Sequence, residues 1–139
     1  MAEGMAKTYA LERGWPMEVR SGGVLGIINR PADPLAVRAM SEIGIDISSH
    51  RSQGIDDDLV EWADHILVME LNHTIQLRER HPELADKALM LGTFGGMMQV
   101  QDPIGGWRWK FRKCRDGLLR CVQGFMDQLP PPQPPTQAP

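Results

Sequence analysis

The sequence predicts an α/β fold in which parallel strands alternate with helices. Two near-continuous apolar runs, 65–70 (HILVME) and 88–92 (ALMLG), have the length of strands that are buried on both faces. A third stretch, 17–24 (MEVRSGGV), alternates apolar and polar residues and then reaches two glycines, as a strand leaving a sheet does. Helical patterns separate the three stretches, so right-handed crossovers are expected to join parallel strands.

Capping residues and apolar spacing predict the helices. The chain opens with MAEGMAKTYALERGW, an amphipathic pattern with no Ser, Thr, Asp or Asn before its first turn. Asp33 caps a second helix with Pro34 at its first position, and Gly44 ends it. Three further helices are expected at 56–63, from 71 up to the interruption at Pro82, and at 107–129.

The first helix has no preceding strand on which its apolar face can rest. A sheet of three strands is also thin for this number of helices. We therefore expect a doubly wound parallel sheet that lacks its first strand.

Composition favours one globular domain, which we assign to residues 1–128, followed by a Pro-rich disordered tail at 129–139. A net charge of −3 gives no reason to expect nucleic acid or an anionic membrane as partner. The two cysteines suit a reducing compartment, and the histidines show no metal-ligand spacing. With neither a signal peptide nor a membrane span in the sequence, we expect a cytoplasmic protein without metal or cofactor.

Five stretches together resemble one family: MAEGMA, VRSGGV, PADPLAVRAMSEIGIDISSHRSQ, ADHILVME and DPIGG. Their order and spacing are similar to those of the low-molecular-weight protein phosphatases, which include tyrosine and arginine phosphatases and are related to one class of arsenate reductase. The resemblance covers about residues 1–128 and implies a flavodoxin-like doubly wound fold.

In that family the first strand leads into a phosphate loop of the form Cys, five residues, Arg, and then into a helix that begins as this chain does. We interpret the sequence as lacking that strand and loop, with truncation, such as a misplaced start, favoured over a non-catalytic relative. The resemblance implies hydrolysis through a phosphocysteine intermediate in the complete family, and an inactive chain here.

Three residues match functional positions of the family. Asp102, in QDPIGG, matches the general acid, and Ser21 and His50 match positions that support the phosphate loop by hydrogen bonds. No residue matches the nucleophile. The implied substrate is a phosphorylated protein or a small aryl phosphate. Ile104 after the Asp-Pro is closer to the arginine phosphatases than to the tyrosine phosphatases, and the oligomeric state stays open.

Two features of the last predicted helix allow more than one interpretation. Cys114 and Arg120 have the spacing of the phosphate-loop signature, but we attribute this to coincidence within a helical pattern. Trp107 and Trp109 are expected to pack on a helix face rather than to form an aromatic wall at the site. The core-facing set is predicted to be Trp107, Phe111, Leu118, Cys121, Val122 and Phe125.

The sequence leaves two alternatives to a phosphatase. A non-catalytic binding module would use the basic stretch RWKFRKCR for anionic surfaces and PPPQPPTQAP as a polyproline ligand. An arsenate reductase relative is disfavoured, because LNHTIQL follows the 65–70 run where a redox pair of cysteines would be needed.

Overall fold

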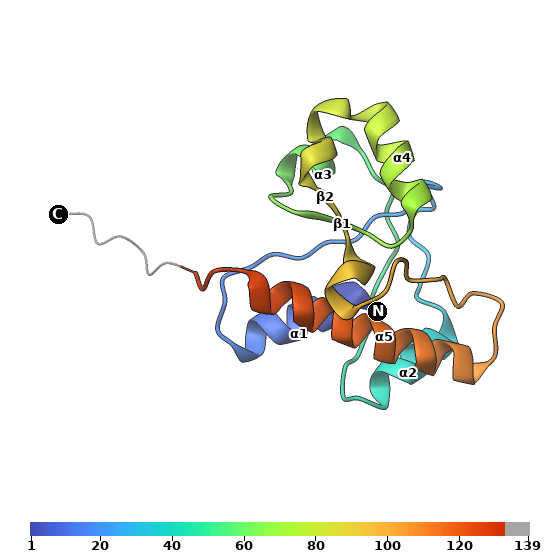
Figure 1. The fold of residues 1–139 in the computed structure, drawn as a ribbon. Helices are drawn as coiled ribbons and strands as arrows, with labels where there is room; N and C mark the ends of the chain where they lie inside the picture. The colour runs from blue at the N-terminus through green and yellow to red at the C-terminus, as the bar shows by residue number, and fades with distance from the viewer. Residues whose placement is uncertain (133–139) are drawn as a thin grey trace.

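The structure, a computed structural model, describes residues 1–132 (Figure 1). The tail predicted at 129–139 therefore lies, from residue 133 on, outside the described residues. The helices are α1 (Ala2–Glu12), α2 (Pro34–Ser41), α3 (Asp57–Trp62), α4 (Leu71–Arg80) and α5 (Arg108–Gln128), with 3-10 turns η1 (Pro82–Lys87) and η2 (Leu91–Gly95). Strands β1 (Ile66–Val68) and β2 (Ala88–Met90) pair in parallel, with Leu67 opposite Leu89. The predicted α/β class with parallel strands is confirmed.

The predicted capping residues and helix ends are confirmed. The Asp33 side chain accepts a hydrogen bond from Leu35 N at 2.7 Å, with Pro34 at the first helical position. Gly44 takes a φ of 78°, which ends the α2 segment in the left-handed region that glycine tolerates. Asp56 caps α3 in the same way as Asp33 caps α2, through a 2.8 Å bond from Leu59 N. At the start of α1, Met1 offers no side-chain cap.

The prediction of a strand at 17–24 is wrong for the chain as it folds here. This segment makes one isolated parallel bridge, between Gly23 and Gly54, with Gly23 N donating to Gln53 O at 2.9 Å. Within residues 1–132, no backbone N–H between 18 and 22 donates to a backbone carbonyl. An alternating pattern specifies two faces, but a strand also needs a neighbouring ladder of hydrogen bonds. In the described sheet β1 pairs with β2 and leaves the 17–22 segment without one.

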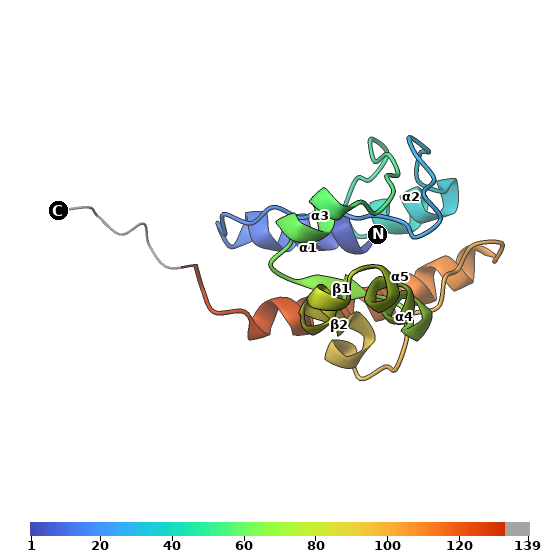
Figure 2. The same ribbon diagram turned by 90° about the horizontal axis from the view of Figure 1, so that it is seen from above.

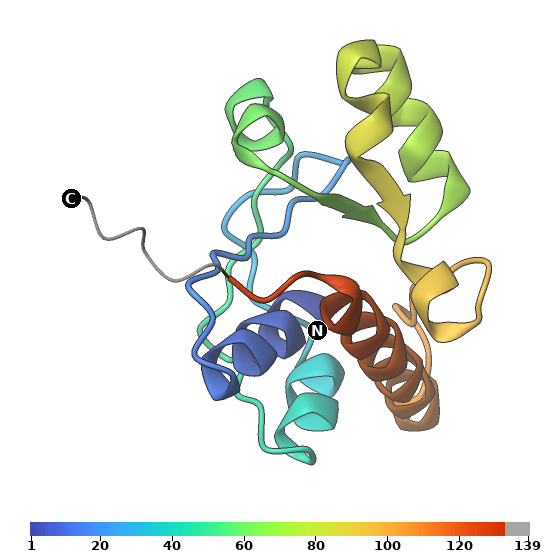
Figure 3. The same ribbon diagram turned by 60° about the vertical axis from the view of Figure 1, so that its left-hand side comes forward.

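The core is built around α5. Helices α1 and α2 and the turn η2 pack on it, and Met5, Met40 and Phe111 are among the side chains that are almost fully enclosed. Figure 3 shows β1 and β2 between this group and α4. A second, smaller cluster joins Val60 and Leu77 under α3 and α4. Most of the buried apolar area therefore lies in the α1–α2–α5 layer.

An ion-pair cluster ties α2 to α5. Arg112 donates to both Glu42 oxygens, with Nε 2.9 Å from Oε2 and Nη2 2.7 Å from Oε1. Arg115 Nη1 adds a 2.8 Å bond to Glu42 and a 2.9 Å bond to the Ala39 carbonyl. The hydrogen bonds from Arg112, helped by those from Arg115, lower the pKa of Glu42 to about 2.

Glu42→Gln is expected to lower the melting temperature by a few degrees at neutral pH. A carboxyl whose pKa is depressed in the folded state stabilises the protein above its unfolded pKa, here 4.5, and this contribution is lost as pH falls toward about 2. The gap between the wild-type and variant melting curves should therefore narrow over that pH range. Glu79→Gln, an exposed change on α4, is the control. A gap that stays constant with pH would contradict the assignment.

Candidate active site

Asp102 lies on the loop that joins η2 to α5. Its Oδ1 accepts a 2.9 Å hydrogen bond from Ile104 N, and Gly106 N donates to Pro103 O at 2.9 Å. Gly105 has a φ of 75°, which a side chain would strain. Among the described residues no protein group bonds Oδ2, and the side chain is exposed. The loop thus holds a carboxylate in a fixed turn with one oxygen available for proton transfer.

Cys114 and the start of α1 lie next to this loop. The Cys114 Sγ contacts the Gln101 carbonyl at 3.7 Å. Burial raises the pKa of the Cys114 thiol, and the nearby Asp102 carboxylate raises it further, whereas the Met1 ammonium acts in the opposite direction. The thiol is therefore protonated at neutral pH and is not an activated nucleophile.

The spacing of Cys114 and Arg120 does not form a phosphate loop. Both residues lie inside the continuous helix α5, and Arg120 is exposed. The backbone N–H groups of a helix interior are used in bonds to the preceding turn, so they cannot converge on an anion. The interpretation of this spacing as coincidence agrees with the structure.

Ser21 and His50 meet at Glu3 in the first turn of α1. Ser21 Oγ donates to Glu3 Oε2, and His50 Nδ1 lies 3.7 Å from the same oxygen. Lys7 binds the other carboxylate oxygen. Burial alone raises the pKa of Glu3, but the hydrogen bonds from Lys7 and Ser21 outweigh it and the net pKa is lowered. An ionised carboxylate thus links the two predicted support residues.

The predicted site residues gather around the beginning of α1 from two sides. Ser21 and His50 reach it through Glu3, while Cys114, which is close to both the Met1 ammonium and the Asp102 carboxylate, lies on the α5 side. Figure 2 shows the N-terminus between α2 and α5. No described contact joins Asp102 directly to Ser21 or His50 within residues 1–132.

Two features of the site, Glu3 and the position of Cys114, were not predicted from the sequence. Glu3 and Lys7 have the i, i+4 spacing of an ordinary surface pair, yet the Glu3 side chain is only 16% exposed. The signal in the sequence is the place of Glu3 itself, an acidic residue in the first turn of the first helix, where a side chain can reach a neighbouring loop. For Cys114 no sequence signal exists, because its neighbourhood depends on how α5 packs against α1.

The expected packing of the two tryptophans is wrong. Trp107 is 78% exposed and Trp109 is 57% exposed. The buried face of α5 begins at Phe111, and Trp109, two residues earlier, points about 200° away from it. The other predicted core residues of this helix are buried: Phe111, Leu118, Cys121, Val122 and Phe125.

Residues 1–132 contain neither a cluster of metal ligands nor a membrane-spanning helix. In that range no three His, Cys, Asp or Glu side chains come together as metal ligands. No helix in the same range has the length and apolar character needed to cross a membrane.

Comparisons with known proteins bear directly on this site. Residues 1–132 match the model of the family described as low molecular weight phosphotyrosine protein phosphatase. The chain is 32% identical over 115 residues to a protein-arginine-phosphatase of Geobacillus stearothermophilus, covering 81% of this chain and 77% of that protein. It is 38% identical over 113 residues to a probable low molecular weight protein-tyrosine-phosphatase, EpsP, of Ralstonia solanacearum, with the same coverage of 81% and 77%.

Solved structures of phosphatases superpose on this chain. The low molecular weight protein tyrosine phosphatase from T. tengcongensis superposes with a TM-score of 0.86 at 31% identity, covering 92% of this chain and 88% of the other. The YwlE arginine phosphatase from Geobacillus stearothermophilus gives a TM-score of 0.81 at 28% identity, covering 91% and 81%. The fold is thus the flavodoxin-like α/β fold of these enzymes, and the chain belongs to the low molecular weight phosphotyrosine protein phosphatase family.

Proposed function

We propose that Asp102 is the general acid and base of a protein phosphatase that acts on phosphotyrosine or phosphoarginine. The observation that supports this most is the Asp102 carboxylate itself, fixed by a hydrogen bond to one oxygen and accessible at the other. The arginine and tyrosine phosphatases among the relatives support both substrate classes.

The chemistry takes two steps. A cysteine thiolate attacks phosphorus, the bond from phosphorus to the leaving oxygen or guanidine nitrogen breaks, and protonated Asp102 gives its proton to that atom. The Asp102 carboxylate then takes a proton from a water that attacks the phosphocysteine, which releases phosphate and restores the thiolate. Ser21 and His50, which meet at Glu3, are proposed to support the phosphate loop of the complete site by hydrogen bonds.

The nucleophile of this scheme is not among residues 1–139. The two cysteines of the sequence, Cys114 and Cys121, both lie within α5. We therefore propose that residues 1–139 alone are catalytically inactive, and that activity requires a cysteine-bearing phosphate loop next to the first turn of α1.

The test compares residues 1–139 with the same chain joined at Met1 to a family-type strand and Cys-x5-Arg loop. Turnover of phenyl phosphate is expected only in the extended protein, and replacing its loop cysteine by serine should abolish it. Cys114→Ser should leave turnover almost unchanged, because that thiol is protonated and lies in a helix. Turnover by residues 1–139 alone, or loss of it in Cys114→Ser with the fold intact, would overturn the proposal.

A further inference from the structure

An exposed surface of mixed aromatic and cationic character follows Asp102 in the chain. We call it the Trp–cation patch; it consists of Ile104, Trp107, Arg108, Trp109, Lys110 and Lys113. Its apolar members are 71% (Ile104), 78% (Trp107) and 57% (Trp109) exposed. Within residues 1–132, no carboxylate lies within 4.0 Å of its three cations. By contrast, Arg112 and Arg115 of the same helix are paired with Glu42.

The patch has internal order. The aliphatic part of Lys110 lies against Gly106, so that a Cβ at this glycine would collide with Lys110 Cδ. Its ammonium is 5.9 Å from the centre of the Trp109 ring, within the range of a cation–π contact. Lys110 is thereby held between the Asp102 loop and an aromatic face.

Folding does not account for these residues. Exposed tryptophans bury little surface, and cations near the start of a helix face its positive end, where acidic side chains would be stabilising. The first turn of α5 contains no acidic residue. A local arrangement that does not favour the fold points to a role in binding.

We propose that the Trp–cation patch binds the polypeptide of an acidic protein substrate, contacting Asp, Glu and apolar side chains that flank the phosphorylated residue. This rests on the proposed function, because the patch begins two residues after Asp102. The Asp102 loop leads directly into the first turn of α5, so this surface is within reach of residues that flank a leaving group at Asp102. The position of the patch beside Asp102 favours a peptide over the other anionic partner, a lipid bilayer, because a lipid surface has no need of the neighbouring proton-transferring carboxylate.

Binding can be measured without catalysis, on residues 1–139. The probe is a fluorescent ten-residue peptide with one tyrosine flanked by glutamates, compared with the same peptide carrying glutamines. The acidic peptide should bind more tightly at low salt. Lys110→Gln combined with Lys113→Gln should weaken that binding by about two- to tenfold, since each exposed ion pair contributes modestly. Trp107→Ser should also weaken it without lowering the melting temperature.

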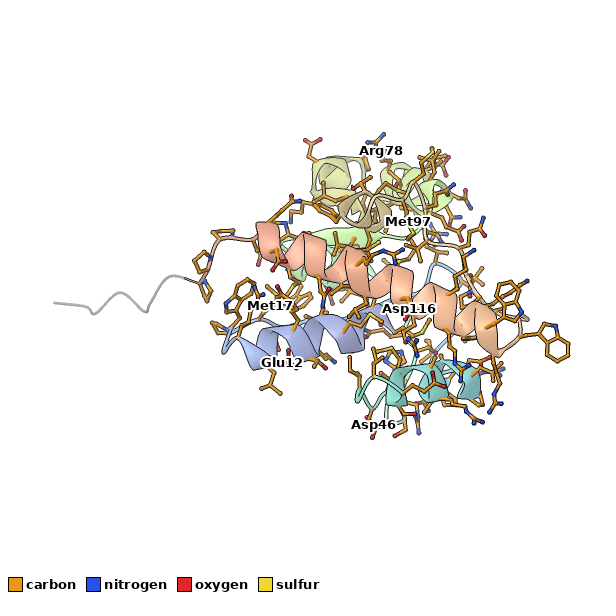
Figure 4. The ribbon with its side chains drawn as sticks, turned by 60° about the horizontal axis from the view of Figure 1, so that its bottom comes forward. Glu12, Met17, Asp46, Arg78, Met97 and Asp116 are labelled. Atoms are coloured by element: carbon orange, nitrogen blue, oxygen red, sulfur yellow. The ribbon has the colours of Figure 1, made fainter. Side chains whose placement is uncertain are left out.

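The matched control is Arg78→Gln combined with Arg80→Gln. These cations are exposed on α4, and Figure 4 shows Arg78 at the upper edge of the molecule, away from α5. This pair removes the same charge and should leave peptide affinity unchanged. Equal losses in both double variants, or equal affinity for the two peptides, would overturn the proposal. If phosphatidylserine vesicles bound more tightly than the acidic peptide, and this binding also depended on Lys110 and Lys113, the partner of the patch would be a membrane and the peptide proposal would be overturned.

Failure of the patch proposal can be distinguished from failure of the proposed phosphatase function. Asp102→Ala should keep full affinity for the acidic peptide, because the patch does not need the carboxylate. Peptide binding together with no phosphatase activity in the protein extended by the cysteine-bearing loop would contradict the proposed function alone. Phosphatase activity in that extended protein without a preference for the acidic peptide would contradict the patch proposal alone.

Discussion

Asp102→Asn is expected to slow the hydrolysis of phenyl phosphate by about 10²- to 10⁴-fold in the protein extended with a cysteine-bearing loop. Asparagine keeps the size of the side chain and its bond to Ile104 N, but it has no acidic proton to give. A poor leaving group such as phenolate depends on that proton, so the loss appears in turnover rather than in substrate affinity.

The dependence on leaving group makes this prediction specific. With 4-nitrophenyl phosphate, whose leaving group needs little protonation, the same variant should lose much less. Asp58→Asn, an exposed acid in the first turn of α3, should change neither rate. Equal losses with both esters would mean that Asp102 positions the loop and does not transfer a proton. No loss with either ester would remove it from the mechanism.

Gly124→Ala is expected to destabilise the fold by about 2 kcal/mol. A Cβ at Gly124 would lie far inside contact distance of the Phe94 carbonyl oxygen, where α5 crosses η2. The obstacle is backbone, so the two elements must separate, at the upper end of the roughly 1–3 kcal/mol that overpacking costs. Alanine recovers only about 1 kcal/mol from its higher helix propensity.

Gly117→Ala is the matched control on the same helix. There a Cβ meets only the end of the Met97 side chain, 3.3 Å away, which can shift. This variant should be as stable as the wild type or more stable. Urea unfolding followed by circular dichroism measures both changes. If Gly124→Ala were as stable as Gly117→Ala, the close approach of α5 to η2 would be refuted.

Elements that are specified locally could be predicted from the sequence. The cap at Asp33 with Pro34, and the cap at Asp56, act through bonds to residues two or three positions away, so the pattern contains the whole interaction. The 17–24 segment could not be settled this way. Its alternating residues fit a strand, but the hydrogen bonds that would make it one must come from a distant part of the chain.

In the candidate site, too, local motifs could be predicted from the sequence, whereas contacts between distant segments could not. The motifs around Asp102, Ser21 and His50 point to these residues through resemblance, yet the link between Ser21 and His50 is a third residue, Glu3, that only the packing of α1 reveals. The tryptophans of WRWKF looked like core residues because apolar side chains usually are. Their exposure depends on which turn of α5 first meets η2 and α1.

The division of the core into two apolar clusters has a consequence for cooperativity. The large cluster joins α1, α2, η2 and α5, whereas Val60 and Leu77 hold α3 and α4 near a sheet of two three-residue strands. A sheet this small adds little stability of its own. Amide hydrogens of α4, β1 and β2 should thus exchange with solvent through local opening. Those of α5 should exchange only when the whole protein unfolds. Val100, two residues before Asp102, is buried in the large cluster. The chain leading to the proton-transferring residue is therefore anchored in the part of the molecule that opens last, whereas α4, β1 and β2 open locally.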